Sequence, residues 1–533
     1  MTATDTKPTA PAPERRSGEL NVRELLRWTW RQLTSMRIAL ILLLMLALAA
    51  VPGSLVPQER VDSLKASEWK DQHETLTPIY EKLGIFNVYG SPWFAAIYIL
   101  LVVSLLGCIV PRTFVYWRGL RAQPPAAPRN LTRLPSHASY ATTESADAVL
   151  ERARAVLARK RYRLRRAAGT GAEVGTVSAE RGYLRELGNL VFHLAVLVVL
   201  VGFAIGTLFG YKGGVILVQG TPFGNNLTQY DDFVPGSLFD PDGMDPFSFT
   251  VNKFDVEWLT SGPRAGMARG FNADLTYTED RGGPEKSYDL RVNHPLKIGS
   301  TELFLIGHGY APVVTVRDGD GNIAASGPVP FLPMGPDLFS FGVIKAQDAK
   351  PGQIGLEGYF YPTFASVDGT PVNLGGNDVN PLLSLNVYTG DLNMDSGAGQ
   401  SVYTLDKSRT TPVKGDDGKP LRLNLTPGET VQLPNGLGSV SFDKVVSWQR
   451  IQISQSPGKD IALLGVVLAL LGLMGSLFIR SRRVWLRVTE NDDGTVVEIA
   501  ALDRSGGADT DAVLSGLVAA LQSDRPSDRE EPS

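Results

Sequence analysis

The chain has 533 residues, of which 43% are hydrophobic and 20% charged, and its formal net charge is −3. This average resembles that of a soluble protein, but the charges are unevenly distributed. Segment 210–460 carries 19 basic and 28 acidic side chains, whereas a nucleic-acid-binding surface would be basic, so no nucleic-acid partner is expected. Walker-loop, HExxH and GxSxG motifs do not occur, which gives no support to the enzyme classes that those motifs mark.

Residues 1–37 lie before the first long apolar stretch and divide into two parts. Residues 1–18 are rich in Pro, Thr and Ala, a composition typical of a disordered tail. Residues 19–37 favour an interfacial helix on membrane lipids, with Trp28 and Trp30 at the headgroup level and arginines on the polar side.

Four stretches carry almost no charge over about 19 residues or more, the length that a helix needs to cross a hydrocarbon core. Buried helices of soluble proteins are usually shorter and amphipathic. The sequence therefore predicts four transmembrane helices, at 38–56, 92–110, 187–209 and 461–479. The first is expected to remain as an anchor, because the segment before it is much longer than the charged start of a signal peptide.

The basic residues near the span ends set the expected orientation. Seven precede the first span, four lie in 57–91, fifteen lie in 111–186, and Arg480, Arg482, Arg483 and Arg487 follow the last span. The segments rich in basic residues alternate with segment 57–91, which is poor in them. Both termini and 111–186 are therefore predicted to be cytoplasmic, with 57–91 as a short outer loop and 210–460 outside.

Two cytoplasmic segments show patterns of a small α/β domain. Within 111–186, SADAVLERARAVLARK has helical spacing, and RYRLRRA and EVGTVSAE are typical of strands. Residues 480–523 predict a hairpin around the turn NDDG, followed by a helix. We hypothesise that the two segments pair in one sheet; residues 524–533 are expected to be a disordered tail.

The outer segment 210–460 is rich in strand signals interrupted by Gly, Pro, Asn and Asp turns. This pattern predicts a large β-rich, sandwich-like domain. The clearest stretches are FSFTVNKFDVEWL, ADLTYTE, SYDLRVN, ELFLIGHGYAPVVTVRD and GSVSFDKVVSWQRIQISQS. The sequence has one cysteine, Cys108 in the second span, so the chain lacks the thiol pair that dithiol exchange requires.

His193 in the third span is the most informative residue, because an intramembrane histidine is costly unless it faces protein, water or a ligand. One interpretation is an interhelical hydrogen bond. Proton relay or transport is disfavoured, since the four spans contain no Asp, Glu or Lys. The third interpretation is an axial ligand to haem iron, with the second ligand from a partner subunit. Gly202, Ala204 and Gly206 would allow a macrocycle or another helix to approach closely.

Other candidate residues are less specific. Cys108 would be a haem ligand as a thiolate, but a lone buried cysteine is more often a small hydrophobic residue. Arg112, Arg181 and Arg185 flank the same face of the membrane; their main role is topological, and they would also pair with haem propionates. His294 and His308 lie in the β-rich domain without a zinc-ligand set around them and are given no catalytic role.

Five segments together resemble the ResB (CcsB) family of cytochrome c biogenesis proteins. They are SMRIALILLLMLALAAVPGSLVPQ, YGSPWFAAIYILLVVSLLGCIVPRT, RGYLRELGNLVFHLAVLVVLVGFAIG, VNHPL with a following Gly-Tyr segment, and SPGKDIALLGVVLALLGLMGSLFIRSRRVW. Each motif is weak by itself, and the specificity comes from their order on this topology. The first 20 and last 45 residues lie outside the resemblance.

The resemblance implies a non-catalytic or co-catalytic subunit of a haem delivery and ligation complex in the plasma (inner) membrane. Haem b in transit would be held by His193, and the outer domain would position apocytochrome c for thioether attachment. The partners implied are a multispanning ResC (CcsA)-type protein, which carries the Trp-rich haem-handling segment absent here, and indirectly a thioredoxin-like thiol reductase. The competing expectation is a membrane-anchored outer assembly or sensor protein without a cofactor.

Overall fold

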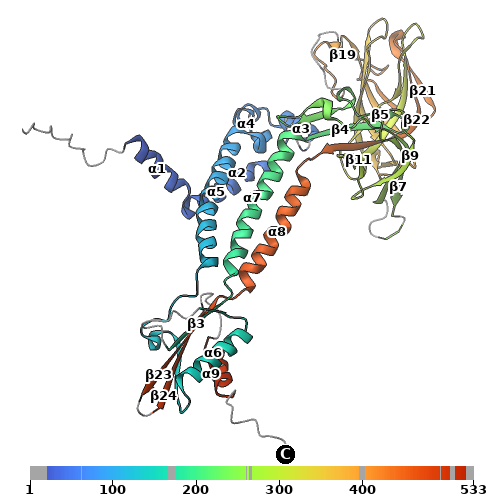
Figure 1. The fold of residues 1–533 in the computed structure, drawn as a ribbon. Helices are drawn as coiled ribbons and strands as arrows, with labels where there is room; N and C mark the ends of the chain where they lie inside the picture. The colour runs from blue at the N-terminus through green and yellow to red at the C-terminus, as the bar shows by residue number, and fades with distance from the viewer. Residues whose placement is uncertain are drawn as a thin grey trace, which may run out of the picture. The chain divides into compact units, whose positions relative to one another are not determined.

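A computed structural model gives the structure of the chain and describes residues 21–59, 61, 63–165, 175–259, 261–262, 267–394, 403–491, 494–503 and 510–523. The chain divides into two compact units. The first comprises Met1–Phe203 and Gly458–Ser533, and the second comprises Ala204–Pro457. Helices and one sheet form the first unit, and the second consists almost entirely of strands (Figure 1).

The described residues contain four helices that are long and apolar enough to cross a membrane, the number that the sequence predicts. They are α2 (Met36–Leu55), α5 (Pro92–Arg121), α7 (Arg185–Phe209) and α8 (Lys459–Phe478). The hydroxyl oxygen of Ser35 accepts a hydrogen bond from the Ile38 amide at 3.4 Å, and that of Ser91 accepts one from Phe94 at 3.3 Å. These side chains cap the first turns of α2 and α5.

The turn between α1 (Val22–Leu33) and α2 packs against α5. Ser104 of α5 donates a hydrogen bond to the Leu33 carbonyl at 2.6 Å. A Cβ atom added at Gly107 would lie 2.0 Å from Cγ2 of Thr34, so this contact requires glycine. The segment between α2 and α5 forms α3 (Ser63–Gln72), α4 (Thr77–Leu83) and the 3₁₀ helix η1 (Ile85–Gly90).

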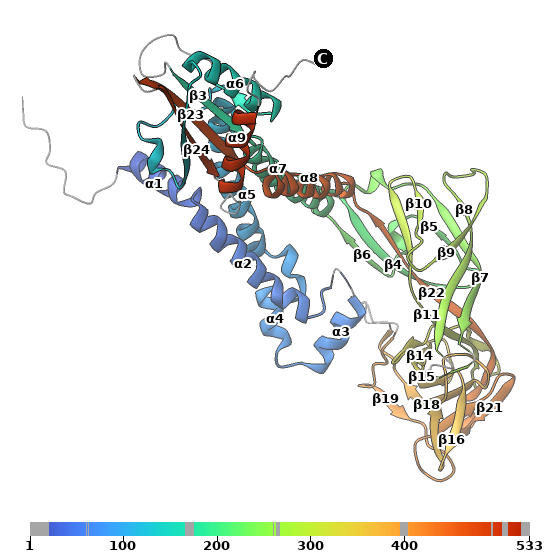
Figure 2. The same ribbon diagram turned by 90° about the horizontal axis from the view of Figure 1, so that it is seen from below.

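A five-stranded antiparallel sheet joins the segment before α7 to the segment after α8 (Figure 2). Its order is β1-β24-β23-β3-β2, and α6 and α9 pack against it around one apolar core. The elements are β1 (Ser136–Thr142), α6 (Ala146–Arg159), β2 (Arg163–Leu164), β3 (Thr176–Arg181), β23 (Arg482–Asn491), β24 (Gly494–Asp503) and α9 (Thr510–Ser523); η2 (Leu131–Arg133) precedes β1.

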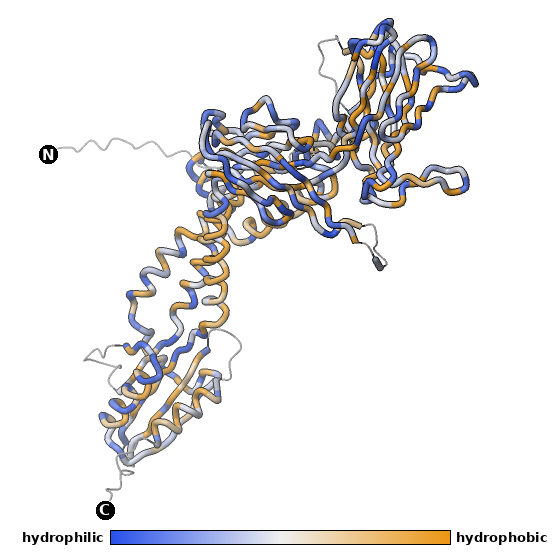
Figure 3. The backbone as a smooth tube through the Cα atoms, turned by 90° about the vertical axis from the view of Figure 1, so that its right-hand side faces the viewer, coloured by the Kyte–Doolittle hydropathy of each residue, from blue (hydrophilic) through white to orange (hydrophobic). Residues whose placement is uncertain are grey.

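The second unit contains sheets of seven, six, four and two strands. Strands lie in all five stretches singled out in the sequence. Hydrophobic and hydrophilic residues are interspersed along the strands of this unit (Figure 3). The strands are β4 (Tyr211–Val218), β5 (Pro222–Gly224), β6 (Asp232–Pro235), β7 (Ser248–Trp258), β8 (Ala268–Thr278), β9 (Lys286–Arg291), β10 (Leu296–Ile298), β11 (Thr301–Arg317), β12 (Ile323–Pro328), β13 (Leu332–Pro333), β14 (Ser340–Ala346), β15 (Gln353–Tyr361), β16 (Phe364–Val367), β17 (Thr370–Asn373), β18 (Leu382–Gly390), β19 (Thr410–Pro412), β20 (Arg422–Leu425), β21 (Glu429–Leu433) and β22 (Gly438–Gln455).

The paired strands β11 and β22 connect two apolar cores within this unit. Leu303 and Ile453 belong to a core shared with β7, β8 and β9, whereas Val314 and Phe442 belong to a core shared with β14, β15 and β18. The register of β11 against β22 shifts between Leu305 and Gly307, close to the place where the ribbon passes from one core to the other. The two apolar cores of the β-rich unit thus lie along one long ribbon of β11 and β22.

Candidate functional site

The third span, α7, packs against α8 along a seam of small side chains, and the two helices lie side by side in both views (Figures 1 and 2). A Cβ atom added at Gly188 would lie 2.5 Å from the amide nitrogen of Ser476, and one added at Gly472 would lie 2.5 Å from that of Phe192. Such spacings bring two backbones into contact, as small residues allow in membranes. The α7 side of the seam comprises Gly188, Phe192, Ala195, Val199 and Gly202.

His193 lies on α7 outside this seam. Since successive helical residues are about 100° apart, it points roughly a quarter turn or more away from its seam neighbour Phe192. The imidazole is half-buried, and its ring centroid lies 5.3 Å from that of Phe192. The seam therefore fixes which side of α7 carries His193, namely a side that does not face α8.

The tautomer of His193 follows from one hydrogen bond. Nδ1 lies 2.8 Å from the carbonyl oxygen of Asn189, one helical turn earlier. A carbonyl oxygen only accepts, so Nδ1 carries the hydrogen and donates, and Nε2 of the neutral ring keeps the lone pair. Among the residues that the structure describes, none makes a hydrogen bond with Nε2.

This geometry fits one axial position of haem iron. A metal-ligating histidine commonly donates its second ring N–H to a carbonyl, which orients the ring and raises the basicity of the ligating nitrogen. The described residues contain no group of three or more His, Cys, Asp or Glu side chains that would hold a bare metal ion. A metal that already has four macrocycle ligands needs only axial ligands, and His193 offers one.

Tyr98 of α5 also contacts α7, and no pattern in the sequence points to it. Its hydroxyl donates to the carbonyl oxygen of Leu200 at 2.5 Å. Leu200 lies seven residues after His193, nearly two full turns, so the two residues share a side of α7 about 10 Å apart along the axis. A single tyrosine in an apolar span has no periodic signal, and only the packed helices show its partner.

The three arginines predicted near haem lie on different elements. Arg185 is the first residue of α7 and its Nε donates to the Ser476 carbonyl at 3.2 Å. Arg181 ends β3 opposite Arg482, and Arg112 is exposed on α5. No hydrogen bond within the described part of the chain links any of them to His193, so propionate contacts remain a prediction.

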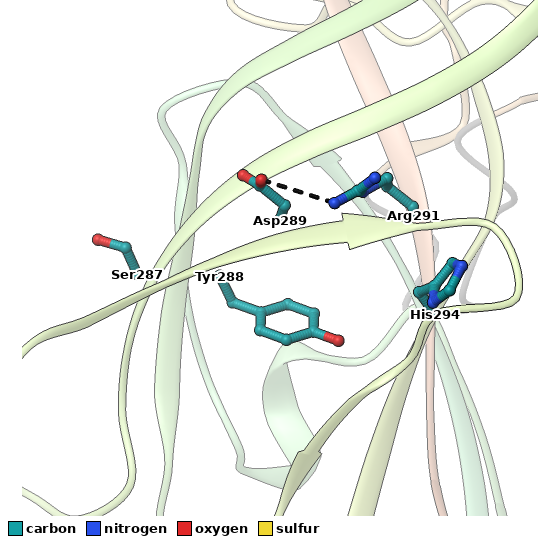
Figure 4. Close-up of a pocket in the computed structure, with 5 residues that line it drawn as sticks. All are labelled: Ser287, Tyr288, Asp289, Arg291 and His294. Atoms are coloured by element: carbon teal, nitrogen blue, oxygen red, sulfur yellow. Dashed lines mark ion pairs between the residues drawn. The ribbon is translucent and has the colours of Figure 1, made fainter.

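The two remaining groups of interest lie elsewhere. The thiol of Cys108 donates to the Thr34 carbonyl at 2.9 Å, at the packed turn between α1 and α2. His294 lines a depression of about 430 Å³ in the second unit (Figure 4). Its other members are mostly exposed, and Asp289 and Arg291 form an ion pair at 3.9 Å. Neither place shows the features of a catalytic centre.

Comparison with known proteins gives a consistent family match. The model of the ResB-like family matches residues 36–514. A protein named cytochrome c biogenesis protein CcsB from Synechococcus elongatus is 25% identical over 478 residues, covering 86% of this chain and 85% of the relative. A protein of the same name from Microcystis aeruginosa is 23% identical over 462 residues, covering 85% and 87%.

The match to some relatives is shorter. With the CcsB protein of Synechococcus sp. strain JA-2-3B'a(2-13) the identity is 25% over 286 residues, which is 51% of this chain. The matched part of the chain spans 55% of the length of that relative. It spans 60% of the length of a CcsB protein from Thermosynechococcus vestitus.

Proposed function

The chain belongs to the ResB-like family, and from this premise we propose that it acts in cytochrome c biogenesis as a membrane subunit that holds haem in transit. The observation that carries the proposal is the lone pair of His193 Nε2 on a membrane helix, with Nδ1 fixed by the Asn189 carbonyl. The names of the relatives, cytochrome c biogenesis protein CcsB, support the same process.

In this role haem b is the cargo of the subunit. His193 donates the Nε2 lone pair to one face of the iron, and a ResC (CcsA)-type multispanning partner supplies the second axial ligand. Arg112, Arg181 and Arg185 are the candidates for pairing with the propionates. This chain is therefore a non-catalytic or co-catalytic subunit of the ligation complex, because the thioether chemistry requires the partner.

We further propose the sidedness that the basic residues predict. The α/β sheet and both termini face the cytoplasm, and the β-rich unit lies outside the plasma membrane, where it positions apocytochrome c for thioether attachment. The excess of Lys and Arg in 1–37 and 111–186 supports this orientation. A separate thioredoxin-like protein keeps the apocytochrome thiols reduced, since the only cysteine of this chain is in α5.

The test is the haem spectrum of the full chain purified with its multispanning partner. His193→Ala is expected to reduce the haem content and shift the Soret and α bands. His137→Ala is the matched control, because Nδ1 of His137 also contacts a backbone carbonyl, that of Leu134 at 3.0 Å, outside the spans. Unchanged haem content and bands in His193→Ala would refute the ligand role. A colourless complex, with c-type cytochromes intact after gene loss, would instead favour an anchored assembly protein without a cofactor.

A further inference from the structure

The β-rich unit contains a second cavity, of about 480 Å³, beside the ribbon of β11 and β22. This volume lies within the range of small-molecule sites, and both polar and apolar groups line the cavity. The cavity is lined by β7, β11, β22 and the loop before β18, with Phe254, Trp258, His308, Tyr310, Asp378 and Lys444 among its residues. All of them belong to the second unit, so the cavity is independent of α7 and His193.

His308 is held at the wall of this cavity by aromatic rings. Its ring centroid lies 4.8 Å from that of Phe271 and 5.3 Å from that of Phe254. The register shift between Leu305 and Gly307 comes directly before it in β11. Such irregularities commonly re-aim a side chain next to a functional site. The position of the imidazole is thus determined by the strand and by two packed rings.

The ring nitrogens of His308 make no hydrogen bond with any residue in the described part of the chain. Burial lowers the pKa of His308 from 6.5 to about 4, so the imidazole is neutral near pH 7 and one nitrogen keeps its lone pair. Buried polar groups are nearly always paired. A half-buried imidazole beside a cavity, without a protein partner, is therefore available to a ligand.

The remaining lining residues narrow the class of ligand. Phe254 and Trp258, both partly exposed, offer flat apolar surface, whereas Tyr310 is buried in the adjacent core. Lys444 is exposed at the cavity and forms no ion pair with the described residues, so it can pair with an acidic group of the ligand. Asp378 is exposed on the loop side and adds one negative charge. A bare metal ion does not fit, because no second His, Cys, Asp or Glu set among the described residues converges on His308.

We propose that this cavity is a second haem site, in which His308 ligates the iron, the aromatic rings contact the macrocycle, and Lys444 pairs with a propionate. A single neutral imidazole cannot hold an ion alone, but it suffices for one axial position of an iron that already has four macrocycle ligands. The proposal rests on the proposed function for the identity of the ligand, whereas the site itself lies outside the membrane spans.

The experiment titrates ferric haem into the full chain, purified with its multispanning partner in lipid nanodiscs, and measures the haem stoichiometry and the Soret band. We expect His308→Ala to lose one haem per chain while the His193-dependent spectrum stays. His294→Ala is the matched control, since it removes an exposed histidine of the same unit. Lys444→Gln is expected to weaken the second binding step about tenfold, the loss of one charge-assisted contact.

Two measurements separate ligation from folding. His308→Phe keeps a ring between Phe254 and Phe271, so it should preserve thermal stability and still lose one haem. Free imidazole should restore the lost Soret band in His308→Ala, which a purely structural role would not allow. Wild-type stoichiometry and spectrum in both His308 variants would overturn this inference. If His193→Ala alone then removes haem, the proposed function stands; if His308→Ala alone removes it, the membrane-ligand role fails and the cavity site stands.

Discussion

Replacing Gly472 by alanine is expected to force α7 and α8 apart, whereas the same change at Gly475, three residues later, should leave them in contact. A Cβ atom at Gly472 would lie 2.5 Å from the amide nitrogen of Phe192 and 2.8 Å from the carbonyl oxygen of Gly188. At Gly475 the nearest atom is Cα of Gly188, at 3.5 Å, an ordinary contact. The atoms opposed to Gly472 are backbone, so no side-chain rotation relieves the overlap.

Both variants gain the same helix propensity, about 1 kcal/mol for Gly→Ala. The difference in stability between them therefore reports only the packing of the added methyl group. Relieving the overlap at Gly472 requires a separation of roughly 1 Å, and overpacking of a well-packed contact costs about 1–3 kcal/mol. Gly472→Ala should therefore be less stable than Gly475→Ala by about 1–3 kcal/mol. Larger residues at Gly472 should widen the difference.

The assay is thermal unfolding of the full chain in detergent, followed by circular dichroism. Gly206→Ala is a second control, because no atom lies within 4 Å of the added Cβ on the same helix α7. The expected order of Tm is Gly472→Ala below Gly475→Ala and Gly206→Ala. Equal Tm values for Gly472→Ala and Gly475→Ala would refute the seam as the contact that fixes α7.

Three further changes test other parts of the molecule. Because burial lowers the pKa of His308 from 6.5 to about 4, this histidine is protonated at a higher pH in the unfolded state than in the folded state. The free energy of unfolding therefore falls by up to about 3 kcal/mol as the pH drops from 6.5 to 4. Denaturant titrations should show a weaker dependence of this free energy on pH in His308→Phe, and the same dependence as in the wild type would contradict the prediction. Glu180 is only 7% exposed, and its carboxylate accepts hydrogen bonds from Arg483 at 3.0 Å and from Arg163 at 3.1 Å. Glu180→Ala should therefore lower the free energy of unfolding by about 3 kcal/mol and expose the loop before α7 to protease. Wild-type protease resistance in this variant would contradict the pairing. Tyr98→Phe removes the hydrogen bond to the Leu200 carbonyl and should lower stability by about 1 kcal/mol, and an unaltered thermal transition would show that α5 is held without it.

The spans and strands could be predicted because each leaves a local pattern in the sequence. About nineteen uncharged residues mark a crossing helix, and alternation marks a half-buried strand. The seam between α7 and α8 leaves no such pattern, since both helices are apolar on every side. Gly202 and Gly206 are equivalent in the sequence pattern, but a Cβ atom at Gly202 would lie 2.7 Å from the amide nitrogen of Ala462, whereas one at Gly206 would meet open space.

The contacts of His308 also leave no local pattern in the sequence. Its two ring contacts come from β7 and β8, more than thirty residues earlier in the chain, and the register shift that precedes it arises from pairing with β22. The sequence gives this histidine no catalytic role, because no metal-ligand set surrounds it. That criterion detects sites for bare ions, and it misses a site that would contribute only one axial ligand.

The orientation of α7 constrains how a second axial ligand would reach the haem that we propose His193 holds. The backbone contacts at Gly188, Gly472 and Gly202 leave no room for a macrocycle between α7 and α8. Nδ1 is engaged by the Asn189 carbonyl, so only Nε2 can ligate, and iron would have to bind on a side of α7 turned away from the seam. The Tyr98 hydroxyl meets α7 on that same side, nearly two turns further along. A partner helix that supplies the second axial ligand should therefore approach α7 opposite α8, on the cytoplasmic side of the Tyr98 contact in the proposed orientation.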